Sequence, residues 1–212
     1  MTRRVKEILT KWPLSCIIGF LLVILSWASM SIAIILAPRT FNPFKNYMSS
    51  LGNSSFNPDG AFFYNVSVIV SGFLFTLFFL GLSMWYTDII IDKNILRMTQ
   101  MFGCLLAFTI ILTGIFSEDF KPQHIFWSII AGILGFVVNV LLAIFLIRQK
   151  EAIRKISYSI LILIGFYVIF LFILSPTHVL TEWIVRTLGD INLILITYNL
   201  KKIYSIRIYL FS

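Results

Sequence analysis

The chain is built of long apolar stretches separated by short polar connections. Six stretches are long enough for a membrane span of about 20 residues, and they cover residues 13–37, 61–86, 97–116, 123–147, 156–175 and 182–200. Their apolar runs are continuous, whereas a β-barrel shows short alternating strands, and helices satisfy their own backbone in lipid. The pattern predicts an all-α integral membrane protein, a six-transmembrane-helix bundle in a single domain over residues 1–212.

Composition supports this prediction and excludes other classes of protein. Of the 212 residues, 59% are hydrophobic and 12% are charged, while about a quarter of a soluble domain is charged. The mean hydropathy of +0.95 leaves too little polar surface for a soluble globule. The net charge of +8 comes from Lys and Arg residues that lie in the predicted membrane loops. We therefore expect lipid as a partner and do not expect nucleic acid.

The basic residues orient the predicted bundle. Most of the 17 Lys and Arg residues fall on the side that holds the N-terminus, whereas the other side holds Arg39, Lys45 and Lys121, with Arg186 just inside the last stretch. Cytoplasmic loops of membrane proteins carry an excess of Lys and Arg. We therefore expect a multi-pass protein of the cell membrane with both termini cytoplasmic.

Polar residues of other kinds gather on the opposite, predicted outer side. Ser50 lies in the long connection 38–60, Asn65 near the start of the second stretch, and Asp119 and His124 around the turn before the fourth. His178 precedes the sixth stretch. This asymmetry makes the outer side the predicted location of a ligand-binding site.

The sixth stretch carries three charged residues on one helix face. Glu182, Arg186 and Asp190 are spaced four apart, a spacing that aligns side chains on a helix. Charges inside a membrane usually face the bundle interior or a wet cavity. Two interpretations remain open: a ligand-binding face, or an acid–base–acid ladder that only locks the helix in place.

The histidines suggest a second chemistry. His124 and His178, with Glu182 or Asp119, offer two imidazoles and a carboxylate, a ligand set of some hydrolytic zinc sites. We assign Glu182 as the first choice of carboxylate, and Ser50, Glu118 or a bound water is available for acid–base or nucleophilic steps. The alternative is two interfacial histidines that bond to loop carbonyls. No cofactor is otherwise indicated, so zinc stays a minor alternative.

Two further segments invite structural predictions. Residues 43–52 have the spacing of a short interfacial helix ended by Gly52, either a lid over the site or a passive anchor. Small residues at helical spacing form one face of the fourth stretch, and we expect close helix packing there: Ser128, Ala131, Gly132, Gly135 and Asn139. Close helix packing is also predicted for the second stretch, from Ser67, Ser71 and Gly72.

Several motifs occur in an order that resembles one family of small polytopic proteins from archaea and bacteria, the domain-of-unknown-function 998 family. They are Ser50-Leu51-Gly52, Phe63-Tyr64-Asn65, Gly72, and Gly114-Ile115-Phe116-Ser117-Glu118-Asp119 followed by His124, with Glu182 opening the last stretch. With Glu182-Trp183, the plan is also similar to the eukaryotic Frag/DRAM/Sfk six-helix family.

This resemblance implies a six-helix fold and one recurring outer constellation of Ser50, Asn65, Asp119, His124 and Glu182. The chain departs from the family pattern in two places. Ser117 replaces the usual proline, and Trp183 follows Glu182 where a basic residue is expected, a role that Arg186 takes one turn later. The resemblance implies no established activity.

Three functions are compatible with these residues. The first is binding of a lipid headgroup or a small polar ligand in an outer cavity, through His124, Glu182 and Arg186. The second is metal-dependent hydrolysis of lipid amides or esters. The third is a structural or assembly role in which the polar groups only lock helices. We favour the first because the chain has a charged ladder and no complete catalytic motif.

Overall fold

The computed structural model describes residues 12–174 and 178–211. The described part is all-α, which confirms the predicted class. Six long helices carry it: α2 (Leu14–Leu36), α3 (Ala61–Gly81), α4 (Ile90–Ile115), α5 (Lys121–Arg148), α6 (Arg154–Leu174) and α7 (Val179–Phe211). Short 3₁₀ helices lie between them: η1 (Ser49–Gly52), η2 (Leu82–Trp85) and η3 (Glu118–Phe120).

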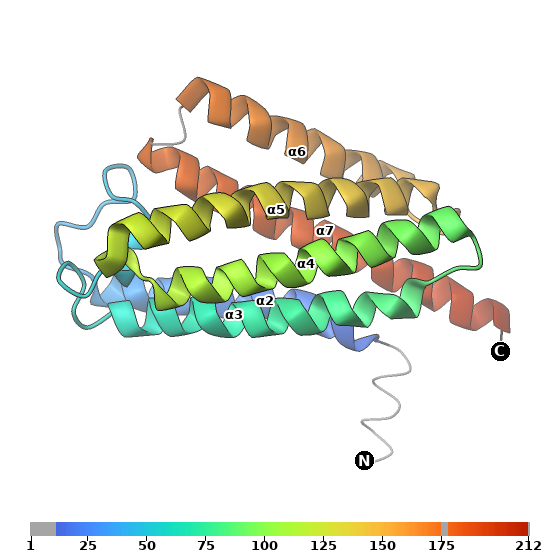
Figure 1. The fold of residues 1–212 in the computed structure, drawn as a ribbon, viewed down its shortest axis with the longest axis horizontal. Coiled ribbons are helices and arrows are strands. Elements are labelled where there is room, and N and C mark those ends of the chain that lie inside the picture. Colours follow the sequence, from blue (N-terminus) through green and yellow to red (C-terminus); the bar gives the residue numbers. More distant parts are fainter. Residues whose placement is uncertain (1–11, 175–177, 212) are drawn as a thin grey trace, which may run out of the picture.

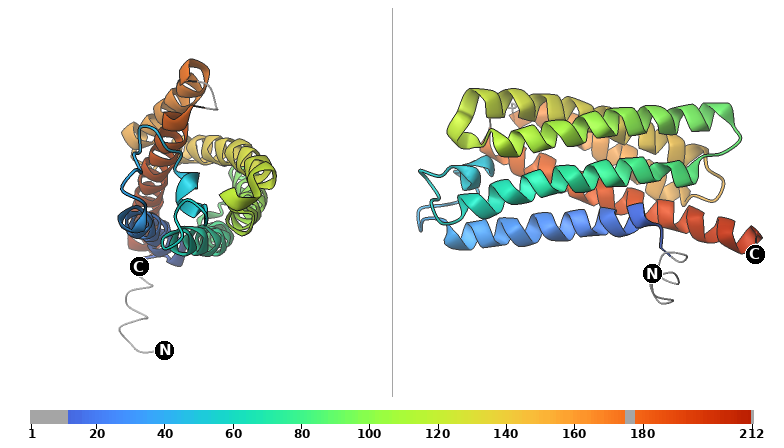
Figure 2. Two further views of the ribbon diagram at one scale, coloured as in Figure 1. Left: turned by 90° about the vertical axis from the view of Figure 1, so that its left-hand side faces the viewer. Right: turned by 60° about the horizontal axis from the view of Figure 1, so that its bottom comes forward.

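The long helices form a ring that runs up and down (Figures 1 and 2). Each packs against its neighbours in sequence, and α7 closes the ring by packing on α2. The connection 37–60, η3 and the start of α7 lie together at one end, which we call the first-loop end. The C-terminus and the connections before α4 and α6 lie at the other, the terminal end (Figure 1).

The surface of this ring is apolar along the length of the helices. Large side chains such as Ile24, Phe73, Leu105 and Ile133 are exposed, as expected for helices that contact lipid tails. Within the described residues, four helices are long and apolar enough to cross a membrane: Leu14–Leu36, Ala61–Trp85, Ile90–Ile115 and Glu118–Arg148. The structure is therefore that of a helical membrane protein.

Two helices extend beyond the predicted stretches. α4 begins at Ile90 rather than at residue 97, because Asp92 is buried against the α5–α6 connection instead of lying in a solvated loop. α7 continues to Phe211 rather than ending near residue 200, and Ile203 in this extension is fully buried. Arg3, Arg4, Lys6 and Lys11 lie outside the described residues, as do 175–177.

A buried polar network ties the terminal end together. The Asp92 carboxylate, 2% exposed, accepts hydrogen bonds from Arg148 Nε and from Gln149 Nε2, the latter at 3.1 Å. Gln149 Oε1 accepts a 2.7 Å bond from Arg207, whose guanidinium also lies 3.8 Å from Glu151. These contacts join α4 to α7 through the α5–α6 connection.

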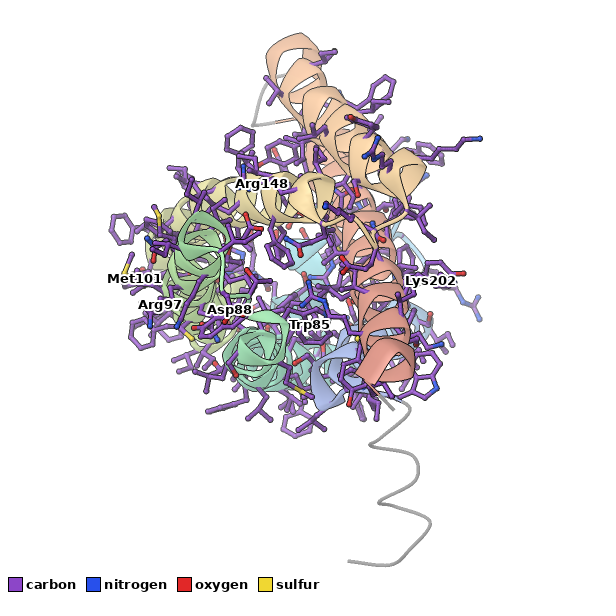
Figure 3. All side chains as sticks on the ribbon, turned by 90° about the vertical axis from the view of Figure 1, so that its right-hand side faces the viewer. Trp85, Asp88, Arg97, Met101, Arg148 and Lys202 are labelled. Atoms are coloured by element: carbon purple, nitrogen blue, oxygen red, sulfur yellow. The ribbon has the colours of Figure 1, made fainter. Side chains whose placement is uncertain are left out.

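Basic side chains are spread across the terminal end (Figure 3). Arg97, Arg148 and Lys202 lie on different sides of this end, and Trp85, which is fully buried, lies toward its middle. The Trp85 Nε1–H donates to the carbonyl of Leu200 at 3.0 Å. An indole N–H buried in an apolar core needs such a partner, so η2 is fixed against α7.

Glycines allow α3 and α4 to approach closely. A Cβ on Gly72 would meet the Ala107 carbonyl at 2.8 Å, and one on Gly114 would meet the Asn65 carbonyl at 3.1 Å. Ser67 and Ser71 are buried. The predicted small-residue packing face of the second stretch is confirmed.

The predicted interfacial helix over 43–52 is wrong for most of its length. Only Ser49–Gly52 is helical, as the 3₁₀ helix η1. Before it, Asn46 Oδ1 accepts from the Asn42 N–H at 2.9 Å, and Asn42 Oδ1 accepts from the Phe44 N–H at 2.9 Å. Asn side chains that bond to nearby backbone favour turns over helix, which explains the difference.

We predict that Asp92→Asn weakens the fold. Loss of the charge removes the charge-assisted bond from Arg148, worth about 1–3 kcal/mol of unfolding free energy. The midpoint of thermal unfolding in detergent should fall by several degrees. Asp88→Asn is the matched control, because Asp88 is exposed in the preceding connection; an equal fall in both variants would contradict the assignment.

Candidate functional site

A cavity of about 760 Å³ opens at the first-loop end, between α5, α6 and α7. We call it the end cavity. α6 diverges from α5 toward this end (Figures 1 and 2), and the cavity lies where they separate. Its polar wall at the first-loop end includes Tyr47, Ser49, Glu118, Lys121, His124 and Glu182. Its apolar wall includes Ile125, Ile129, Ile133, Phe136, Val168 and Val185.

The polar wall has an excess of carboxylates. Glu118, on η3, lies 3.7 Å from the Lys121 ammonium, and the Lys121 side chain is 66% exposed. Glu182 enters from α7. Two carboxylates therefore face one ammonium, before His124 is considered.

The His124 side chain, from α5, caps the C-terminal end of α4 and also lines the cavity. Its Nδ1 lies 2.9 Å from the Phe116 carbonyl and 3.2 Å from the Thr113 carbonyl. Because both partners are acceptors, Nδ1 carries the proton, and it satisfies carbonyls at the helix C-terminus. The other ring nitrogen is left for a second partner, and Glu182 lines the same cavity.

Glu182 holds the connection between α2 and α3 against α7. Its carboxylate accepts from the Ser49 N–H at 3.1 Å and from the Ser49 hydroxyl at 3.4 Å. Ser49 begins η1, and backbone N–H groups at a helix start have no partner within the helix. A carboxylate from another helix therefore caps η1. The predicted ladder is interrupted here, since Glu182 bonds to the connection rather than to Arg186.

Further contacts fasten the same connection. The Trp183 indole donates to the Asn46 carbonyl at 3.1 Å, and Asp119 Oδ1 accepts from the Ser54 N–H at 2.9 Å and from its hydroxyl at 3.0 Å. The Asn65 amide donates to the Gly52 carbonyl at 2.9 Å. Asp119 and Asn65, predicted as ligand residues, thus bind the chain itself.

Apolar burial completes the anchoring. Met48 and Leu51 are 6% and 0% exposed and pack with Met30 and Ala33 of α2, beside Trp183. Leu51 alone contributes about 2 kcal/mol of hydrophobic stabilisation at this degree of burial. The connection is therefore a fixed cover at the first-loop end.

Ser50 and His178 do not line the end cavity. Ser50 is half-buried in η1, and the end cavity is lined by its neighbour Ser49 instead. His178 is exposed, and its Nδ1 accepts from the Leu180 N–H at 3.2 Å. Throughout residues 12–174 and 178–211, no three His, Cys, Asp or Glu side chains are grouped to hold a metal ion. His124, His178 and Glu182 therefore do not assemble as a zinc site.

Arg186 and Asp190 form an ion pair deeper in the bundle. Arg186 Nε lies 3.1 Å from Asp190 Oδ2, and the guanidinium also bonds to the Ser26 hydroxyl of α2. Asp190 lies about 12 Å beyond Glu182 along α7 at about 1.5 Å per residue. The lower half of the predicted ladder is thus a local pair.

The two glycines of the small-residue face of α5 do not bring a neighbouring helix close, contrary to the prediction, although Ala131 of the same face packs against the core. A Cβ on Gly132 would meet only the Tyr167 hydroxyl at 3.5 Å, and one on Gly135 would meet nothing within 4 Å. Gly132 and Ser128 line the end cavity. Small side chains here leave open volume instead of bringing helices together.

Three residues that no motif or pattern in the sequence singled out also shape the site. Ser49 is the backbone partner of Glu182, Tyr167 stands opposite Gly132, and Asn192 is buried deeper in the bundle. Asn192 follows the charged ladder by two residues and is the kind of polar side chain that marks function in a membrane span. Tyr167 and Ser49 carry no comparable signal.

Comparison with known proteins identifies the family. Residues 18–197 match the family described as a protein of unknown function, DUF998, so the chain belongs to it. No curated protein and no solved structure matches the chain significantly. The resemblance in the motifs is confirmed for this family, whereas the likeness to Frag/DRAM/Sfk proteins stays a prediction.

We predict that Glu182→Ala releases η1 while the helical ring remains folded. The Ser49 N–H loses its acceptor, so its deuterium exchange should become faster by about tenfold or more for a bond worth roughly 1.5–3 kcal/mol. Asp59→Ala is the control, since Asp59 is exposed in the same connection. Unchanged protection of residues 48–52 in Glu182→Ala would refute the capping role.

Proposed function

We propose that this protein binds an amphipathic molecule, a membrane lipid, in the end cavity. The headgroup lies at the polar wall and the hydrocarbon chain along the apolar wall. The observation that carries the proposal is the division of one cavity of about 760 Å³ into a polar end and an apolar length. Ligand sites usually fall between about 300 and 1,000 Å³.

The charges of the polar wall favour a headgroup with an ammonium group. Glu118 and Glu182 supply two carboxylates, and Lys121 supplies one ammonium. A zwitterionic headgroup places its own ammonium near the carboxylates and its phosphate near Lys121. A small polar solute with an ammonium group shares this chemistry but leaves the apolar wall uncovered.

The other two functions have less support. Metal-dependent hydrolysis needs a donor set, and the described residues do not group one. A purely structural role accounts for Glu182, Asp119 and Asn65, which fasten the connection. It does not account for a cavity of this size, because protein interiors are close-packed.

Blocking the cavity tests lipid binding. We expect Gly132→Phe to lose the lipid that co-purifies with the parent protein in a mild detergent, measured by mass spectrometry of organic extracts. The new ring enters the cavity without a backbone clash, since a Cβ at Gly132 meets only the Tyr167 hydroxyl.

Gly165→Phe is the matched control. Gly165 is exposed on α6, and a Cβ there meets nothing within 4 Å. Equal lipid content in the two variants would overturn the proposal. A polar solute in the aqueous extract that disappears with Gly132→Phe, while lipid content stays constant, would assign the cavity to a solute instead.

The placement in the membrane is a second part of the proposal. We infer that all six long helices span the cell membrane and that both termini are cytoplasmic. The antiparallel ring supports six crossings (Figure 1), and the gathering of Lys and Arg at the terminal end supports a cytoplasmic location for that end.

Cysteine labelling in intact cells tests this orientation. We predict that Ser55→Cys, in the exposed part of the first connection, reacts with an impermeant thiol reagent from outside. Lys150→Cys, exposed at the terminal end, should react only after lysis. The parent protein controls for Cys16 and Cys104, and the reverse labelling pattern would show that the bundle is inverted.

A further inference from the structure

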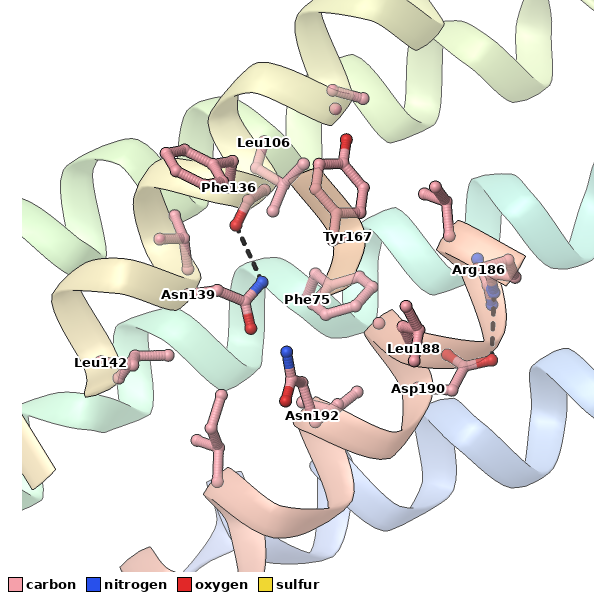
Figure 4. A pocket seen from close by; sticks show the side chains of 18 of the residues that line it. Phe75, Leu106, Phe136, Asn139, Leu142, Tyr167, Arg186, Leu188, Asp190 and Asn192 are labelled. Atoms are coloured by element: carbon pink, nitrogen blue, oxygen red, sulfur yellow. Dashed lines mark hydrogen bonds and ion pairs between the residues drawn. The ribbon is translucent and has the colours of Figure 1, made fainter. Parts of the chain in front are cut away.

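A second cavity, of about 250 Å³, lies in the middle of the bundle, and we call it the central cavity. It is lined mainly by apolar side chains of α3, α4, α5 and α7, together with Asn139, Asn192, Arg186 and Asp190 (Figure 4). Four residues line both cavities: Gly132, Phe136, Tyr167 and Val185. The two cavities are therefore adjacent, and these four residues form the wall between them.

Asn192 has a hydrogen-bonding group that the protein leaves unsatisfied. The residue is 4% exposed, and its buried Oδ1 has no hydrogen-bond partner. Buried polar atoms in proteins almost always have a partner. This oxygen is enclosed by the protein, and in Figure 4 the Asn192 nitrogen, not the oxygen, points toward Asn139. The amide N–H₂ is therefore the group that Asn192 offers to an occupant of the cavity.

Asn139 faces Asn192 from the opposite wall. Its Nδ2 donates to the Gly135 carbonyl at 2.8 Å, one turn earlier on α5, so its carbonyl oxygen is the group left for an occupant. In Figure 4 the Asn139 oxygen and the Asn192 nitrogen point toward one another. Two side-chain amides from different helices thus present one acceptor and one donor to the same small volume.

The remaining polar groups of the cavity carry no net charge. Arg186 and Asp190 neutralise each other through their 3.1 Å ion pair. A charged solute in this apolar volume would lose its hydration without gaining a counter-ion, which is costly. An uncharged solute avoids that cost.

We propose that the central cavity binds a small uncharged solute with a hydrogen-bond donor beside an acceptor, the chemistry of a carboxamide or a urea. The donor of the solute bonds to Asn139 Oδ1, and its acceptor receives a hydrogen bond from Asn192 Nδ2. The apolar wall accommodates a short aliphatic group. The solute enters from the end cavity, past Gly132 and Tyr167.

Acetamide is a suitable probe, and saturation-transfer difference NMR on the detergent-purified full chain detects its binding. We expect a saturation-transfer signal with the parent protein and its loss with Asn192→Leu. This variant keeps the side-chain volume and removes an unsatisfied polar group, so its thermal midpoint should not fall. Gly165→Leu, outside both cavities, is the control for a substitution on a neighbouring helix.

Two results would overturn the site: no acetamide signal with the parent protein, which would leave the cavity to water, or an undiminished signal with Asn192→Leu. If Asn192→Leu fails to fold, Asn139→Leu decides between the same outcomes from the other wall. The lipid proposal is judged separately, because acetamide has no hydrocarbon chain and lipid content is measured in the extract.

Discussion

The arrangement of the first-loop end depends on one carboxylate from α7. Glu182 accepts hydrogen bonds from the backbone and side chain of Ser49 at the start of η1. Such charge-assisted bonds contribute about 1.5–3 kcal/mol each where solvent is excluded. Because Glu182 also lines the end cavity, the group that fixes the cover is also part of the proposed ligand site.

The family motifs acquire a physical explanation from this cover. A Cβ on Gly52 would meet the Asn65 side chain at 2.4 Å, and the Asn65 amide bonds to the Gly52 carbonyl. Asp119 holds Ser54, and Ser117, in place of the usual proline, caps η3 by bonding to Asp119. Most of these polar residues therefore fasten chain to chain, while His124 and Glu182 do so and also face the cavity.

The sequence was sufficient to locate the helices, because apolar length alone distinguishes a membrane helix from its connections. It was not sufficient to choose partners for polar groups. Glu182 could bond to Arg186 one turn away, and its true partner, Ser49, lies far along the chain. Small residues were equally ambiguous: Gly72 permits close packing, whereas Gly132 and Gly135 border open volume. The difference depends on the neighbouring helix, which no local pattern specifies.

The open volume is itself an argument for an occupant. Unfilled space in a packed interior loses dispersion contacts, and the divergence of α6 exposes apolar wall that a neighbouring helix would otherwise cover. In a membrane, lipid chains can restore those contacts in the end cavity without any change of fold. They cannot form hydrogen bonds with the Asn139 and Asn192 amides that line the central cavity. The two cavities thus favour occupants of different chemistry, although Gly132 and Tyr167 border both.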